Sequence, residues 1–162
     1  MRRTTVSTHA LLPLGLCASI SASLLLAAGS PADASKKDMQ RLQGTWTLVA
    51  DEVNGKREEV RDAAELVIRE NKMTMRAKVR GTDVSDESEF RVDATKTPKE
   101  LDEIYTGQKD PERKGVAKAI YRLSGDELTI CGNAIGSEPR PTEFKTRPRD
   151  GLSLSVWKRK RR

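Results

Sequence analysis

The sequence has very little of the chemistry on which most enzymes depend. Its single histidine is His9, and of its two cysteines only Cys131 lies outside the first 34 residues. A serine or cysteine nucleophile normally needs an adjacent base, most often a histidine. Zinc sites usually combine several histidine and cysteine ligands, so one cysteine with carboxylates is unlike the usual set. We therefore expect no enzyme of these classes, no metal and no cofactor.

The N-terminus has the features of a secretory signal peptide. Arg2 and Arg3 supply positive charge, residues 11–28 are uncharged and rich in Leu and Ala, and Ala32-Asp33-Ala34 has the small-x-small pattern of a cleavage site. We predict a signal peptide over residues 1–34, a mature chain without a transmembrane span, and a periplasmic, cell-surface or extracellular location. An uncleaved membrane anchor stays open, because residues 11–28 are about as long as a spanning helix of ~18 residues.

The charge of the mature chain is balanced except at its C-terminus. Residues 35–157 hold 23 basic and 23 acidic residues. The last five residues, Lys158-Arg159-Lys160-Arg161-Arg162, are all basic. Such a segment predicts weak, salt-sensitive contact with polyanions through a basic tail over residues 158–162. The alternative interpretation is a frayed, solvated terminus.

Alternation of apolar and polar residues predicts an all-β fold. Trp46, Leu48 and Ala50 share one face of a strand over residues 45–50, and residues 72–80 alternate most clearly. About eight strands follow a short helix at residues 38–42, and the last strand is expected over residues 152–157. Eight antiparallel strands in sequence suit a closed barrel without free edges. We therefore expect one small barrel domain over residues 35–157.

Two segments between these strands are predicted as loops. Residues 81–88 contain Asp83, Asp86 and Glu87, and Glu89 follows them. Carboxylates can bind calcium, but this spacing is not that of an EF-hand, so a solvated acidic loop is favoured. Residues 132–148 are rich in Gly and Pro and are expected to form a long loop with a short strand near Phe144.

Several short motifs also follow one another in a specific order. They are Leu42-Gln43-Gly44-Thr45-Trp46, Glu52-Val53-Asn54-Gly55-Lys56, Pro98-Lys99, Ile120-Tyr121, Gly125-Asp126-x-Leu128, Cys131 and Arg140-Pro141-Thr142-Glu143-Phe144. Gly-x-Trp after a helical lead-in resembles the lipocalin signature, and the whole series resembles the lipocalin-like domain of uncharacterised exported proteins abundant in planctomycete-type bacteria. The resemblance implies a small barrel outside the cytoplasm. It implies no reaction and no catalytic residues.

The apolar strand faces supply a candidate barrel lining. Its members are Trp46, Leu48, Met73, Met75, Phe90 and Tyr121. Methionine adapts to irregular shapes, so these side chains suit a small apolar ligand, but barrels of this size are also found filled by their own side chains. The small number of aromatic residues, six in all, favours a filled barrel.

We therefore expect a monomeric, non-catalytic binding or scaffold protein, with a small apolar ligand as one option. One alternative is a filled barrel that contacts or inhibits another protein or a polyanion. A hydrolase that uses carboxylates is the weaker alternative; Asp102 and Glu103 are neighbours on a strand, so they face opposite ways and cannot form the pair themselves. Cys131 is expected to be a small buried side chain rather than a reactive thiol.

Overall fold

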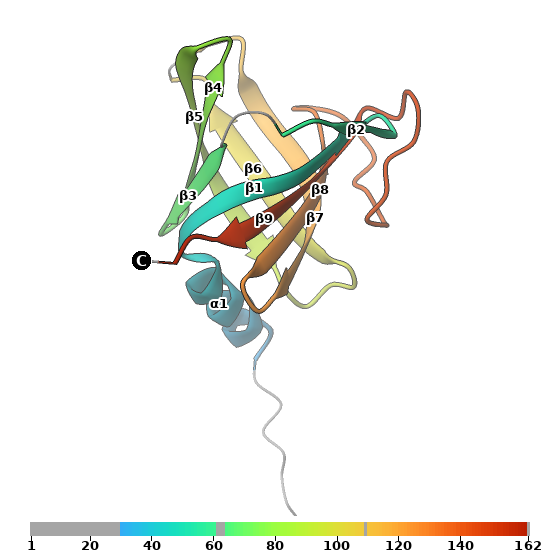
Figure 1. Ribbon diagram of the computed structural model, residues 1–162. Coiled ribbons are helices and arrows are strands. Elements are labelled where there is room, and N and C mark those ends of the chain that lie inside the picture. The colour runs from blue at the N-terminus through green and yellow to red at the C-terminus, as the bar shows by residue number, and fades with distance from the viewer. Residues whose placement is uncertain (1–29, 61–63, 109, 162) are drawn as a thin grey trace, which may run out of the picture.

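The computed structural model of the protein describes residues 30–60, 64–108 and 110–161. Within these residues one helix is followed by nine strands (Figure 1). In chain order they are α1 (Pro31–Leu42), β1 (Gly44–Val53), β2 (Lys56–Glu58), β3 (Glu65–Arg69), β4 (Lys72–Val79), β5 (Thr82–Asp93), β6 (Lys99–Thr106), β7 (Lys114–Ser124), β8 (Glu127–Asn133) and β9 (Leu152–Arg159).

Eight of the strands form a closed antiparallel barrel. From β3 to β9 each strand pairs with the next one in the chain, β1 pairs with β3, and β9 returns to β1. The three residues of β2 pair only with the far end of β1. Closure satisfies the backbone hydrogen bonds that an edge strand would leave open. The expected all-β barrel of about eight strands with a short N-terminal helix is confirmed.

Helix α1 lies across one end of the barrel, which we call the closed end (Figure 1). Pro31 opens the helix, and Asp33 in its first turn accepts a hydrogen bond from the Ser30 backbone N–H at 3.2 Å, near the positive end of the helix dipole. At the other end of the helix the Leu42 carbonyl accepts a hydrogen bond from Trp46 Nε1 at 2.9 Å. Both side chains are completely buried. The helix and the first strand are thereby fixed to each other.

Asp38 ties the same helix to the far side of the barrel. Its carboxylate accepts hydrogen bonds from Lys99 Nζ at 2.5 Å and from the Tyr121 hydroxyl at 2.8 Å. Burial alone would raise the pKa of Asp38, but these two hydrogen bonds and the charges of Lys99 and Arg41 outweigh it and hold the pKa below its ordinary value. The aspartate therefore stays ionised in the folded protein.

The C-terminal residues belong to the barrel rather than to a separate tail. Strand β9 continues through Lys158 to Arg159, two residues beyond the end that the sequence predicted. The Arg159 guanidinium stacks 4.0 Å from the centre of the Trp46 ring and donates hydrogen bonds to the Gln43 and Arg41 carbonyls at 2.6 and 2.5 Å. These contacts explain the difference, because apolar alternation along a strand does not reveal an arginine that stacks on a ring.

The next two basic residues are also engaged. Lys160 contacts Glu65 at 2.6 Å, and its backbone N–H bonds the Thr45 carbonyl at 2.8 Å. Arg161 contacts Asp126 at 3.2 Å. Arg162 lies outside the described residues. The expected free basic tail from residue 158 is thus corrected, because Lys158 and Arg159 belong to β9 and Lys160 and Arg161 form ion pairs with the barrel.

The segment expected to be an acidic loop is a strand. β5 begins at Thr82 and its residues 82–89 pair with the whole of β4, with Ala77 opposite Val84 and Val79 opposite Thr82. Its outward carboxylates face lysines of β4, with Glu87 3.5 Å from Lys72 and Asp83 3.8 Å from Lys78. Cross-strand pairs of opposite charge favour a strand where composition alone suggests a loop.

Residues 134–151 form an outer loop against the barrel wall. Arg140 fastens it there by donating to the Leu101 and Ala119 carbonyls at 3.0 and 2.7 Å and to Asp102 at 2.5 Å. No strand forms near Phe144 in this segment; its ring instead lies 4.9 Å from the Arg122 guanidinium. Cys131 is completely buried, its thiol 3.9 Å from the Lys145 carbonyl, and burial raises its pKa.

The predicted signal peptide falls mostly on residues 1–29, which lie outside the described residues. Its last three residues, Ala32-Asp33-Ala34, form part of the first turns of α1. Within the described part of the chain, no helix has the length and apolar character needed to cross a membrane.

Candidate functional site

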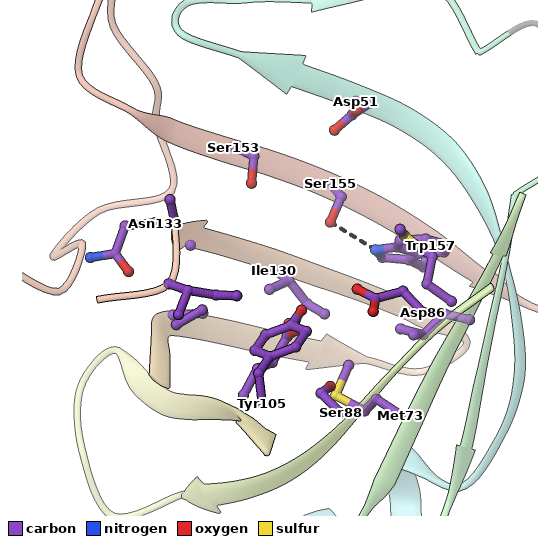
Figure 2. A pocket seen from close by; sticks show the side chains of 18 of the residues that line it. Asp51, Met73, Asp86, Ser88, Tyr105, Ile130, Asn133, Ser153, Ser155 and Trp157 are labelled. Atoms are coloured by element: carbon purple, nitrogen blue, oxygen red, sulfur yellow. Dashed lines mark hydrogen bonds between the residues drawn. The ribbon is translucent and has the colours of Figure 1, made fainter. Parts of the chain in front are cut away.

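A cavity of about 580 Å³ occupies the half of the barrel opposite α1, which we call the cavity end. Figure 2 shows side chains that line it. Its lining comes from the ends of β1, β6 and β8 and from the starts of β7 and β9, together with inward residues of β3–β5. The apolar part of this lining includes Leu48, Leu66, Met73, Ile130 and Trp157. Small-molecule sites commonly have volumes of roughly 300–1,000 Å³. The barrel is therefore neither wholly filled nor wholly empty.

The six residues predicted to line the barrel separate into two groups. Leu48, Met73 and Met75 line the cavity. Trp46, Phe90 and Tyr121 do not line it and lie in the packed core, to which the buried Met73 also belongs. Alternation along a strand indicates which face a side chain occupies, but it does not indicate how far along the barrel axis the side chain lies. The sequence therefore could not separate the two groups.

A β-bulge in β1 turns an acidic residue into the cavity. Leu48 pairs with Trp157, but the next aligned pair is Ala50 with Val156, so the inward face changes between these positions. Asp51 then lies opposite Ser155 and lines the cavity, whereas the sequence predicted Ala50 on the inward face. Figure 2 shows Asp51 beside Ser153 and Ser155. Burial raises the pKa of Asp51, and the charge of Glu58 on β2 adds to this effect although a backbone hydrogen bond opposes it.

The opposite wall carries a connected polar group. The Tyr105 hydroxyl donates a hydrogen bond to Glu103 at 2.8 Å, and the Arg113 guanidinium lies 4.8 Å from the centre of the Tyr105 ring. Arg113 also forms an ion pair with Asp86 at 2.8 Å. All four residues line the cavity. They come from β5, β6 and the connection before β7, so the barrel joins residues that are distant in sequence.

The surroundings of Glu103 and Tyr105 at this wall favour their uncharged forms. Burial raises the pKa of Glu103, and the nearby charge of Asp86 raises it further, while the Tyr105 hydrogen bond and the charge of Arg113 oppose the shift. Burial and the neighbouring Glu103 likewise raise the pKa of the Tyr105 hydroxyl, which therefore remains a hydrogen-bond donor. Glu103 is thus a carboxyl group whose ionisation costs energy in the empty cavity.

The start of the outer loop completes the lining. Ala134 and Ile135 reach the cavity directly after β8, and the Gly136 N–H bonds the Val116 carbonyl at 2.9 Å. Gly115 permits this approach, because a Cβ atom there would lie 2.7 Å from Cγ2 of Ile135. A side chain at position 115 would force Ile135 to shift.

The other candidate residues of the sequence lie outside the cavity. Asp102 points outward from β6 and pairs with Arg91 and Arg140, whereas its neighbour Glu103 points inward. Of the four carboxylates considered for calcium, only Asp86 lines the cavity, and the described residues contain no group of three or more ligands arranged for a metal. The one sequence signal for the polar wall was the spacing of Glu103 and Tyr105, which lie two residues apart and therefore share one face of a strand. No signal indicated Arg113 or the bulge before Asp51.

No protein-family model and no curated protein matches this sequence. Among solved structures, the chain is similar to a crystal structure of a mutant of the fluorescent protein UnaG, with 10% sequence identity over 76% of this chain and 99% of that chain and a TM-score of 0.40. A similarity at this level carries no argument about function.

Proposed function

We propose that this chain is a non-catalytic binding protein that holds one small, largely apolar molecule inside its barrel. The observation that supports the proposal is the cavity of about 580 Å³, whose apolar side chains Leu48, Leu66, Met73 and Ile130 surround unfilled space. Transfer of apolar ligand surface from water to such a lining is favourable by roughly 25 cal/mol per Å². This supplies the driving force for binding.

The polar residues of the cavity fit a binding role better than a hydrolytic one. Asp86 is neutralised by Arg113, and Glu103 is restrained by Tyr105. A carboxylate-dependent hydrolase instead presents an acid and a base to the substrate across a cleft. We expect no turnover of chromogenic glycosides or esters, and measurable turnover that disappears in Glu103→Gln would support the hydrolase alternative.

A neutral fluorescent probe tests the binding role. N-phenyl-naphthylamine should bind the wild-type protein with enhanced fluorescence, and Ala117→Phe should abolish the enhancement because Ala117 lines the cavity. Ser85→Phe is the matched control, since Ser85 is exposed on β5. Absence of probe binding to the wild type, or equal binding to both variants, would contradict the proposal.

We further propose that the protein is exported and belongs to the lipocalin-like family that its motifs resemble. Support for export comes from the charged start, the apolar run and Ala32-Asp33-Ala34. Cleavage after Ala34 would shorten α1 but retain Asp38 and its contacts with Lys99 and Tyr121. Intact-mass analysis of protein from its native host should show Ser35 as the first residue, and a mass that includes residues 1–34 would refute the cleavage.

A further inference from the structure

The charged groups of the cavity are unequal in number. Asp51, Asp86 and Glu103 contribute carboxyl groups, whereas Arg113 is the one basic residue among the described residues that line it. The charge of Arg113 is already engaged, because its guanidinium lies 2.8 Å from Asp86 and stacks over Tyr105. The remaining surface therefore presents two carboxyl groups without a matching cation.

These two carboxyl groups lie on different walls. Asp51 stands on β1 and Glu103 on β6, and neither forms an ion pair with a described residue. The side-chain hydrogen-bond partner of Glu103 is the Tyr105 hydroxyl, which uses one of the several acceptor positions of a carboxylate. An ionised carboxylate that is removed from water is unfavourable unless a positive group compensates it.

The same arrangement of charges disfavours an anionic ligand. To reach the guanidinium of Arg113 it would have to displace Asp86, and it would then lie beside Glu103. A protonated Glu103 offers the anion no positive charge, and an ionised Glu103 and the displaced Asp86 both repel it. The cavity therefore disfavours ligands that carry a carboxylate or phosphate group, even though its apolar side chains suit an alkyl chain.

We propose that the ligand is an organic cation, an amine or guanidine that carries an apolar group. This inference rests on the proposed binding function. The apolar group packs against Leu48, Leu66 and Ile130, and the cationic group donates hydrogen bonds to Glu103, with Asp51 on the facing wall. The ligand thus supplies the positive charge that the cavity lacks.

Three molecules that share one alkyl chain distinguish the binding function itself from the preference for a cation. Decylamine, decanol and decanoate are titrated into the protein by calorimetry, with the fluorescence of the cavity residue Trp157 as a second readout. Decylamine should bind at least about tenfold more tightly than decanol, because a hydrogen bond to a charged group contributes roughly 1.5–3 kcal/mol. Decanoate should bind most weakly. Equal binding of all three overturns the inference and leaves the binding function intact, whereas binding of none overturns both.

Variants then assign the selectivity to particular residues. Glu103→Gln should reduce decylamine affinity by about tenfold relative to decanol affinity. Asp86→Asn should strengthen decanoate binding, because it frees Arg113. Glu89→Gln is the matched control, since it removes the same charge from an exposed position on β5. A similar loss in Glu89→Gln and Glu103→Gln would show a general charge effect and overturn the assignment.

The wild-type protein provides a test that does not depend on the folding of a variant. Protonation of Glu103 removes the partner of the ligand cation, so decylamine affinity should fall as the pH is lowered, while decanol affinity stays constant. Decylamine affinity that does not change on acidification, or that changes in parallel with decanol affinity, would overturn the inference.

Discussion

Asp38 at the closed end and Glu103 at the cavity end are both carboxyl groups inside the same barrel, yet their surroundings act in opposite directions. Asp38 is held by Lys99 and Tyr121, and its pKa lies below the ordinary value. Glu103 has a hydroxyl partner and an acidic neighbour, Asp86, and its pKa lies above the ordinary value. The closed end is complete within the chain, whereas the cavity end leaves charge and volume for another molecule.

The largest expected effect is at the closed end. Trp46→Ala removes a completely buried ring that contacts both α1 and Arg159. It should lower the free energy of unfolding by about 3–5 kcal/mol, as for other large core truncations. Met75→Ala at the cavity end, where the side chain is 43% exposed, should cost less than about 2 kcal/mol. Denaturant unfolding of both variants measures the difference, and equal losses would show that the two ends are not packed differently.

Loss of a buried ion-pair partner should have the next largest effect. Asp38→Asn removes the charge that accepts hydrogen bonds from Lys99 and Tyr121 and should cost about 1.5–3 kcal/mol at pH 7. Because the folded pKa of Asp38 is lowered, its stabilisation is present above the ordinary value of 3.8 and is lost as the pH falls through the folded pKa. The difference between wild type and variant should therefore shrink on acidification. A constant difference from pH 7 to pH 2 would argue against this ionised contact.

Glu103→Gln should stabilise the protein, whereas Asp38→Asn should destabilise it. The raised folded pKa means that the folded protein holds this proton more tightly than the unfolded chain, so stability is lost as the pH rises from 4.5 through the folded pKa. The uncharged variant should melt a few degrees above the wild type at pH 8 and at the same temperature near pH 4. Thermal melts at the two pH values test this, and a lower melting temperature at pH 8 would show that Glu103 is stabilising in the empty cavity.

The smallest effect on stability is expected for removal of the last two residues, whereas the nearby Arg159 contributes more. Removal of Arg161 and Arg162 should leave the free energy of unfolding unchanged within about 0.5 kcal/mol, because Arg161 forms only an exposed ion pair with Asp126. Arg159→Ala should cost about 1–3 kcal/mol, since two carbonyl groups lose their donor.

Heparin retention should fall in the form that lacks Arg161 and Arg162 if the terminus binds polyanions. Equal retention of full-length and truncated protein would place that affinity elsewhere.

Much of the barrel was predictable because strand alternation is a local property of the sequence. The strands with Met73 and with Leu128 were recognised from their own residues, as was the helical lead-in before Trp46. The first half of β5 was predicted as a loop, because its outward acidic residues find lysines only on the paired strand. Arg159 was assigned to a tail because its partner Trp46 lies at the other end of the chain.

The sequence by itself determined an all-β chain, about eight strands, their inward faces and the scarcity of catalytic side chains. Tertiary structure decided where along the barrel each inward residue lies, and therefore which side chains fill the closed end and which surround the cavity. It also decided that a bulge turns Asp51 inward and that Glu103, Tyr105, Arg113 and Asp86 meet on one wall. The physical reason is that pairing register and barrel closure depend on contacts between distant segments, and local alternation carries no information about them.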